Sequence, residues 1–137
     1  MLRNPSRVST MVFDWGSIKW LVTPTGVDDA TSTLGEVIIN PTKGHDRHNH
    51  PNADEIIYVV EGEGRQTVGD DPEFAIKGGD AVWIPRGSMH STFNTTWRPL
   101  RLVVTYTPGG EEQALRGVPD FQELAPGDAP CWDVHSG

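Results

Sequence analysis

The chain carries, between residues 44 and 55, the sequence Gly44-His45-Asp46-Arg47-His48-Asn49-His50-Pro51-Asn52-Ala53-Asp54-Glu55. His48 and His50 are two residues apart. On a β-strand such side chains point to the same face, so both imidazoles can converge on one point. A His-x-His pair alone is a weak signal for a metal site, and its meaning depends on what surrounds it.

Two further polar residues could complete such a site. Glu55 opens the apolar segment 56–60, directly after the break at Pro51, and could return a carboxylate to the same point. His90 follows the turn at residues 85–87, at the start of a predicted strand. The sequence therefore offers three imidazoles and one carboxylate that different strands could bring together.

The rest of the chain reads as short strands separated by turns. It contains 15 glycines and 11 prolines, which disfavour long helices. Turn signals recur about every 8 to 12 residues, the spacing of an all-β sandwich or barrel. The segment 56–60 is β-branched or aromatic throughout and is expected to be buried on both faces. We expect one short helix at 111–116 and strands at 18–23, 34–39, 56–60, 65–68, 73–76, 81–84, 91–94 and 100–107.

Two spacings in the chain resemble the paired motifs of the cupin family. The first is His48-x-His50-x4-Glu55-x6-Gly62, and the second is Gly79-x5-Pro85-x-Gly87-x2-His90-x3-Asn94. One position departs from the family pattern, which has a leading glycine where this chain has Thr42; Gly44 follows two residues later. Because that glycine serves a turn, its shift leaves the four polar residues in register.

The resemblance implies an all-β fold, a cupin-type jelly-roll β-barrel (a double-stranded β-helix), over residues 18–107. Residues 1–17 would form an N-terminal arm, and residues 108–137 an irregular, acidic tail rich in proline and glycine. The resemblance also implies one metal ion near the centre of the barrel, with ligands His48, His50, Glu55 and His90.

The chemistry of this ligand set agrees with a catalytic metal. Three imidazoles and a carboxylate suit Fe, Mn, Ni, Co, Cu or Zn rather than Ca or Mg. Four ligands on an octahedral ion leave two positions for water, substrate or oxygen. As a catalytic group, Glu55 could take a proton if it detaches from the metal, and a metal-bound hydroxide is the alternative. The competing interpretation is four polar core residues that satisfy one another without a metal.

Residues around the motifs are candidates for a substrate pocket. They are Trp20, Trp83, Phe93, Asn94 and Tyr106, although an aromatic residue is more often plain core and the asparagine of the second motif is more often structural. His45 precedes the histidine pair by three residues and is expected on the surface or at the rim of the site.

Composition limits the class of partner. The formal charge is −8, and no run of lysine or arginine is present, which argues against nucleic acid or an anionic membrane as partner. The single cysteine, Cys131, excludes an intrachain disulfide and favours a reducing compartment. The longest apolar run, 56–60, is far shorter than a membrane helix, and the first residues lack the apolar core of a signal peptide. We therefore expect a cytoplasmic protein with a small-molecule substrate.

The segment 108–137 contains six carboxylates and one arginine, so it carries −5 of the net charge. The acidity is therefore expected to belong to the tail and not to the pocket. The tail is either a solvated irregular segment or docks through Phe121, Leu124 and Trp132. A second chain could cover the exposed sheet edges of a single barrel, so we expect a homodimer, with the first 25 or so residues or the tail crossing between subunits.

Function is predicted as a metal-dependent cupin enzyme that acts on a small, oxygen-rich organic substrate chelated by the metal. The ligand set serves both redox and non-redox chemistry, so a dioxygenase-like reaction and a cyclase, isomerase or lyase reaction both remain open. The alternative is a non-catalytic module in which the metal or the barrel only holds a small ligand.

Overall fold

The computed structural model describes residues 1–129. These residues form two short 3-10 helices, η1 (Pro5–Arg7) and η2 (Glu111–Gly117), and eleven strands. The strands are β1 (Thr10–Phe13), β2 (Gly16–Val22), β3 (Thr33–Ile39), β4 (Gly44–His48), β5 (Asp54–Glu61), β6 (Glu63–Val68), β7 (Phe74–Lys77), β8 (Ala81–Ile84), β9 (His90–Phe93), β10 (Leu100–Thr107) and β11 (Gln122–Leu124).

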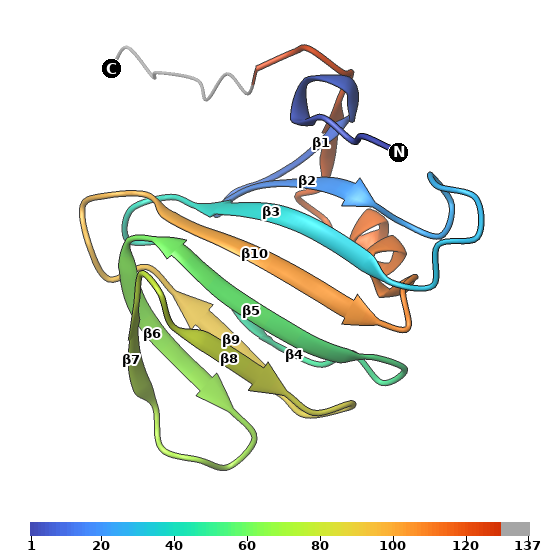
Figure 1. The fold of residues 1–137 in the computed structure, drawn as a ribbon. Helices are drawn as coiled ribbons and strands as arrows, with labels where there is room; N and C mark the ends of the chain where they lie inside the picture. Colours follow the sequence, from blue (N-terminus) through green and yellow to red (C-terminus); the bar gives the residue numbers. More distant parts are fainter. Residues whose placement is uncertain (130–137) are drawn as a thin grey trace, which may run out of the picture.

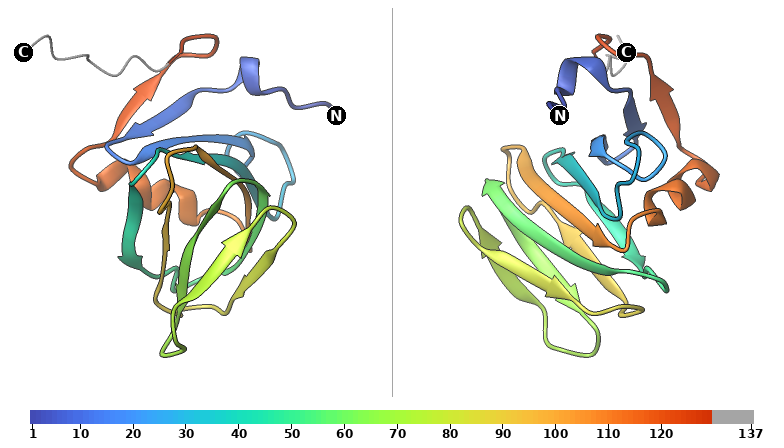
Figure 2. Two further views of the ribbon diagram at one scale, coloured as in Figure 1. Left: turned by 90° about the vertical axis from the view of Figure 1, so that its left-hand side faces the viewer. Right: turned by 45° about the vertical axis from the view of Figure 1, so that its right-hand side comes forward.

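The strands build two antiparallel sheets that lie against each other (Figures 1 and 2). The larger sheet has the order β11-β1-β2-β3-β10-β5-β8, and the smaller has the order β4-β9-β6-β7. Several neighbours, such as β3 and β10, are far apart in sequence, so the sheets are held by long-range pairing. The prediction of an all-β jelly-roll fold is confirmed.

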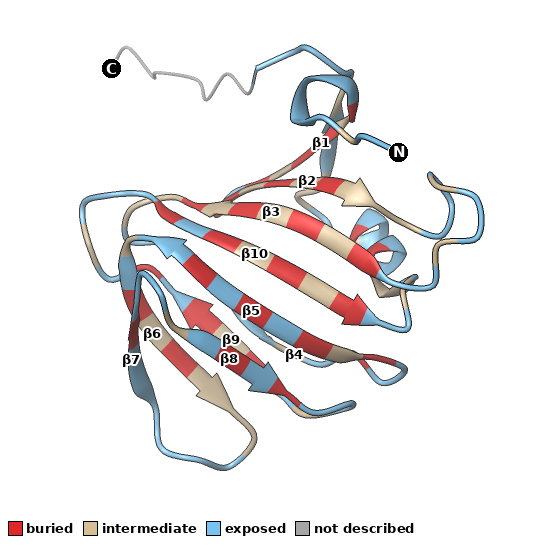
Figure 3. Cartoon of the chain, viewed as in Figure 1, coloured by how far each residue is buried: buried red, intermediate tan, exposed pale blue. Residues whose placement is uncertain are grey.

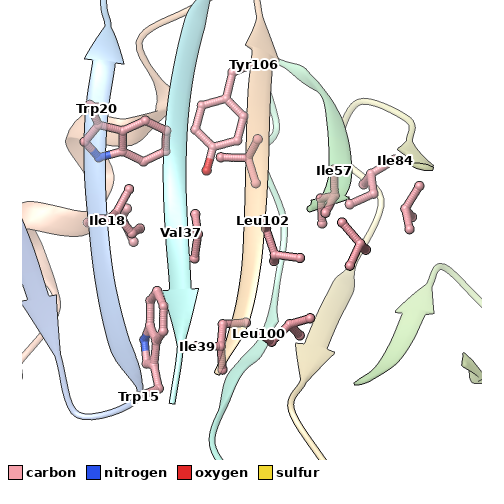
Figure 4. Close-up of a cluster of buried hydrophobic side chains, with 14 of the residues drawn as sticks. Trp15, Ile18, Trp20, Val37, Ile39, Ile57, Ile84, Leu100, Leu102 and Tyr106 are labelled. Atoms are coloured by element: carbon pink, nitrogen blue, oxygen red, sulfur yellow. The ribbon is translucent and has the colours of Figure 1, made fainter. Parts of the chain in front are cut away.

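The core lies between the two sheets and follows the two-residue period of the strands. Along β3 and β10 nearly every second residue is buried, and the intervening ones are partly or fully exposed (Figure 3). This alternation is expected when only one face of an antiparallel sheet is covered. Figure 4 shows the inward residues, among them Val37, Ile39, Leu100 and Leu102, packed into one apolar cluster.

The prediction that residues 56–60 are buried on both faces is wrong for one face. Ile57 and Val59 are buried, but Ile56, Tyr58 and Val60 are 44%, 47% and 38% exposed. A parallel sheet would be covered on both sides, whereas the outer face of this antiparallel sheet is open at Ile56, Tyr58 and Val60.

The N-terminal segment, predicted as an arm over residues 1–17, contributes a strand to the larger sheet. Residues 10–13 form β1, which pairs with β2 and also with β11. Met11, Phe13 and Trp15 are buried in the core, and the rings of Phe13 and Trp15 stack with centroids 5.0 Å apart. Their alternate spacing places all three on the inward face, which overrides the polar character of the preceding residues.

The C-terminal segment docks on its own barrel as far as the structure describes it. Residues 111–117 form the 3-10 helix η2, which matches the helix predicted at 111–116, and β11 then pairs with β1. Leu115 is buried, and Phe121 packs against Phe13 with ring centroids 6.1 Å apart. Trp132, the third residue expected to anchor the tail, lies outside the described residues, as does Cys131. Within residues 1–129, no helix has the length and apolar character needed to cross a membrane.

Candidate metal centre

The four motif residues come from strands, or the turn beside a strand, of both sheets and converge on one point. His48 ends β4 and is the cross-strand partner of His90, which begins β9. Glu55 lies on β5 of the other sheet. His50 lies just beyond the end of β4, so it reaches the group from the following turn rather than as a second side chain of the same strand.

Three imidazoles form a tight cluster suited to a metal ion. His48, His50 and His90 each offer a ring nitrogen, and these three atoms lie within 4.8 Å of one another. The ring centroids are 5.0 Å apart for His48 and His50, 4.2 Å for His48 and His90, and 5.1 Å for His50 and His90. His50 and His90 are buried, and His48 is partly buried.

Backbone carbonyls orient two of the three rings. Nδ1 of His48 lies 2.6 Å from the carbonyl oxygen of Asp46, and Nδ1 of His90 lies 2.9 Å from that of Ser88. A carbonyl oxygen only accepts, so Nδ1 carries the proton in both rings and Nε2 is left with a free lone pair. This is the tautomer in which a histidine binds a metal through Nε2.

The buried nitrogens provide a test of whether these residues fit a metal. Nε2 of His50 and Nε2 of His90 are buried without a hydrogen-bond partner. A buried polar atom without a partner costs free energy, which a coordinated cation would offset. The donor set and its unpaired nitrogens therefore fit a divalent transition metal.

Glu55 is the fourth potential ligand. Its side chain is buried, and Oε1 lies 3.1 Å from Nε2 of His50 and 3.7 Å from Nε2 of His90. Nε2 of both imidazoles is without a hydrogen-bond partner, so this oxygen and the two nitrogens face one another as three potential ligand atoms. Burial raises the pKa of the Glu55 carboxyl, but the two imidazoles outweigh burial and lower this pKa to about 2. The carboxylate is thus ionised and ready to bind a cation.

The imidazoles of His48 and His45 are kept neutral. Burial, together with the neighbouring histidines, lowers the pKa of His48 to about 3 and that of His45 to about 4, from an ordinary value of 6.5. Because a metal binds the neutral form of imidazole, His48 is in its ligating form throughout the physiological pH range.

A small cavity of about 40 Å³ adjoins the cluster. By the usual measure of about 10–15 Å³ for each water, it has room for about three particles the size of a water molecule. The polar part of its lining consists of His45, His48, Glu55, His90 and Thr92. The remaining wall is apolar and is formed by Trp15, Ile18, Trp20, Val37, Ile39, Ile57, Leu102, Val104, Tyr106 and Leu115.

Of the predicted pocket residues, Trp20 and Tyr106 line this cavity, and their rings lie 5.4 Å apart (Figure 4). Trp83 and Phe93 do not. Trp83 is 56% exposed, because its position on β8 faces outward beside Ile56, and Phe93 is 42% exposed. Asn94 is fully buried, but its amide donates to the carbonyl oxygens of Ile39 and Arg98, so it braces a loop and does not reach the cavity.

His45 lies closer to the cluster than the sequence predicted. His45 lines the cavity, with its ring 3.9 Å from that of His48 and stacked at 5.0 Å on Trp15. The pairing of β4 with β9 shifts register between His45 and His48, so the two-residue alternation does not hold across this segment. No signal in the sequence marks that irregularity.

A carboxylate of the C-terminal segment also reaches the centre. Oε2 of Glu111, on η2, lies 3.9 Å from Nδ1 of His50. The next residue, Glu112, is buried and accepts hydrogen bonds from the hydroxyl of Thr33 and from the backbone N–H of Gly110. The expectation that the acidity of the tail is separate from the pocket is therefore wrong, because η2 packs against the open side of the barrel.

Comparisons with known proteins agree with this geometry. The family described as "Cupin domain" matches residues 35–106, more than half of the chain. The protein MJ1618 of Methanocaldococcus jannaschii is 30% identical over 100 residues, which cover 72% of this chain and 79% of that protein. The chain belongs to the cupin family.

Two Streptomyces proteins are also similar in sequence. The tetracenomycin polyketide synthase protein TcmJ of Streptomyces glaucescens is 29% identical over 93 residues, 68% of this chain and 62% of that protein. The polyketide synthase CurC of Streptomyces cyaneus is 31% identical over 101 residues, 73% of this chain and 64% of that protein. The matches thus span less than two thirds of the length of either Streptomyces protein.

Solved structures share the fold. A predicted oxalate decarboxylase from Thermotoga maritima superposes with a TM-score of 0.69 at 19% identity, over 79% of this chain and 99% of that one. KdgF from Halomonas sp. superposes with a TM-score of 0.65 at 18% identity, over 74% of this chain and 88% of that one. At these identities the likeness concerns the fold and not the reaction.

Proposed function

We propose that this protein is a metal-dependent cupin enzyme whose substrate is a small organic molecule with neighbouring oxygens that chelate the metal. The observation that carries the proposal is the pair of buried, unpaired Nε2 atoms of His50 and His90, which face the ionised Glu55 beside a largely apolar cavity. His48, His50, Glu55 and His90 would hold the ion. When bound, the metal supplies Lewis acidity at a carbonyl or enolate oxygen or, with a redox-active ion, activation of dioxygen.

The residues around the cluster have distinct roles in this proposal. Glu55 is ionised; it would hold the ion with the three histidines, and its carboxylate is the group nearest the cluster that could accept a proton from the substrate. Burial, and then the charges of Glu55, Glu112 and Glu111, raise the pKa of the Tyr106 hydroxyl well above its ordinary value. Tyr106 thus stays protonated and can donate a hydrogen bond to a substrate oxygen. The apolar wall excludes water and strengthens these polar contacts.

Two features guide the choice of substrate. The cavity is small, so a substrate larger than a few heavy atoms must displace part of the wall. Two relatives carry names of polyketide synthase proteins, and polyketone chains contain carbonyl groups in chelating positions. These observations support a first panel of diketones, extended to catechols and flavonols for an oxygen-dependent reaction.

The first experiment measures metal content and turnover on the same preparation. We expect about one divalent transition metal for each chain by elemental analysis. Oxygen uptake with iron, manganese, copper or nickel bound supports a dioxygenase-like reaction, and turnover without oxygen uptake supports a cyclase, isomerase or lyase. Failure to bind any transition metal, after supply of each in turn, would overturn the proposal. Stoichiometric metal without turnover of any compound would favour the non-catalytic binding module.

Substitutions connect the result to named residues. His50→Ala is expected to remove stoichiometric metal binding while the barrel stays folded, because a chain of this length has a sufficient apolar core. His45→Ala is the matched histidine control and should leave the metal stoichiometry unchanged. Tyr106→Phe should bind metal normally and lose turnover by about 10- to 100-fold. Unchanged metal content in His50→Ala would contradict the ligand assignment.

We also propose that the protein is a homodimer, assembled through the outer face of the larger sheet. Ile56, Tyr58 and Trp83 lie side by side on this face and are 44%, 47% and 56% exposed, which leaves an apolar patch of roughly 300–400 Å². Among the described strands β8 is also an edge of this sheet. A second copy would cover both features, and the patch would form the centre of the roughly 800 Å² that a stable interface buries on each partner.

Sedimentation tests the dimer. It should show a species of twice the 15.1 kDa chain mass, and Trp83→Glu should shift that species toward monomer. A wild-type monomer would refute the dimer.

A further inference from the structure

The three histidines of the metal centre differ in what holds their rings. His48 and His90 each donate Nδ1–H to the backbone carbonyl two residues earlier. His50 makes no such bond. Its backbone carbonyl is fixed, since it accepts from the N–H of Gly87 at 3.0 Å, but its ring is not oriented by the backbone. The group that faces Nδ1 of His50 is the carboxylate of Glu111.

Glu111 is itself held in place. Its Oε1 accepts a hydrogen bond from the backbone N–H of Asn52 at 3.0 Å, so one carboxylate oxygen is tied to the turn that follows His50. The second oxygen, Oε2, is left for Nδ1 of His50 at 3.9 Å. The Glu111 side chain is only 13% exposed, and the His50 side chain 8%, so little water competes for this contact. The neighbouring Glu112 is engaged by Thr33 and Gly110 and does not replace it.

We propose that Glu111 is a positioning residue of the metal centre, which accepts the Nδ1–H of His50 and so directs Nε2 of this ring toward the metal. The proposal rests on the metal binding proposed above. The present separation is longer than a hydrogen bond, and a movement of about 1 Å closes it to hydrogen-bond distance. A carboxylate on the far nitrogen fixes the tautomer and the orientation of a ligating imidazole and raises its basicity.

Glu111 lies outside the part of the chain that matches the family. The cupin match ends at residue 106, and Glu111 lies beyond it on η2. The same helix places Leu115 in the cavity wall. The segment after the barrel thus contributes both a wall and a carboxylate to the site, and a protein with the two motifs alone would lack this support for His50.

The test measures metal affinity and does not depend on turnover. Glu111→Ala should weaken zinc or cobalt binding by about 10- to 100-fold in a competition titration with a chelator, as found when such outer carboxylates are removed. Glu111→Gln keeps the size of the side chain but has one acceptor oxygen for two donors, the N–H of Asn52 and Nδ1–H of His50, so it should recover only part of the affinity. Gln113→Ala is the matched control, because Gln113 is an exposed residue of the same helix whose side chain accepts only from Arg116. This control should bind as the wild type does.

A spectroscopic measurement distinguishes an effect of Glu111 on the orientation of the His50 ring from an effect of Glu111 on the backbone at Asn52. In the zinc-loaded wild type, nitrogen NMR should show His50 protonated at Nδ1, with slow exchange of that proton, and Glu111→Ala should speed the exchange. If Glu111→Ala does not fold, the wild-type measurement still decides: a rapidly exchanging Nδ1 proton would refute the proposal. Wild-type affinity in a folded Glu111→Ala would refute it as well. Absence of metal binding by the wild type would instead refute the proposed function.

Discussion

The metal-free protein is expected to lose about 3 kcal/mol of its free energy of unfolding when the pH falls from 7 to 5. The cause is the pair of imidazoles at His45 and His48, whose pKa values burial lowers to about 4 and about 3 from an ordinary 6.5. Below pH 6.5 the unfolded chain binds protons at these residues and the native protein does not. Stability therefore falls as the pH is lowered.

The magnitude follows from proton linkage. An imidazole with a pKa of 6.5 in the unfolded chain and below 5 in the native protein loses about 2 kcal/mol between pH 7 and pH 5, so two such groups lose about 4 kcal/mol. Both rings keep some contact with water, and screening reduces the sum to about 3 kcal/mol. Glu55 does not oppose this trend. Its pKa is lowered from 4.5 to about 2, so its contribution is present above pH 4.5 and is lost only below that value.

The assay is urea unfolding at pH 5, 6 and 7 in the presence of a chelator. His45→Gln removes one titrating group, and the dependence on pH should fall by about half, whatever the change in absolute stability. A wild-type free energy of unfolding that varies by less than about 1 kcal/mol over this interval would refute the reasoning, because it would mean that the imidazoles are hydrated in the native protein.

Two further predictions concern the fold. Thr42 has a φ of +65°, a left-handed conformation that is unfavourable for a β-branched residue. Thr42→Gly should therefore raise the free energy of unfolding, by about 1 kcal/mol after subtraction of the cost of glycine's greater flexibility in the unfolded chain. A lower urea midpoint would contradict this. Phe13 is 2% exposed and packs against Trp15 and Phe121, so Phe13→Ala should cost about 3–5 kcal/mol in the same assay. Wild-type stability in that variant would mean that β1 is not part of the core.

Thr42 shows which part of the local backbone structure the motif predicts and which part it does not. The family pattern predicts a glycine there, and the backbone does turn with a positive φ at that residue. The chain thus keeps the turn and not the glycine. The motif spacing correctly predicted a turn at this place, but the strain that follows from the threonine is visible only in the backbone geometry.

The sequence by itself determined the strand-rich architecture and the residues of the metal cluster. The first depends on local information, because turn residues end each strand; the second followed from the resemblance of the two spacings to the cupin motifs, which implied His48, His50, Glu55 and His90 as one set. The same local information predicted a short helix at residues 111–116, where the structure has the 3-10 helix η2.

Only the tertiary structure decided which other side chains reach the site. A register shift in β4 turns His45 into the cavity, and the outward faces of β8 and β9 carry Trp83 and Phe93 away from it. Glu111 meets His50 because η2 folds back over the barrel, across a separation of 61 residues in sequence. These outcomes depend on strand register and long-range packing, which are set by the free energy of the whole core and not by the residues next to each side chain.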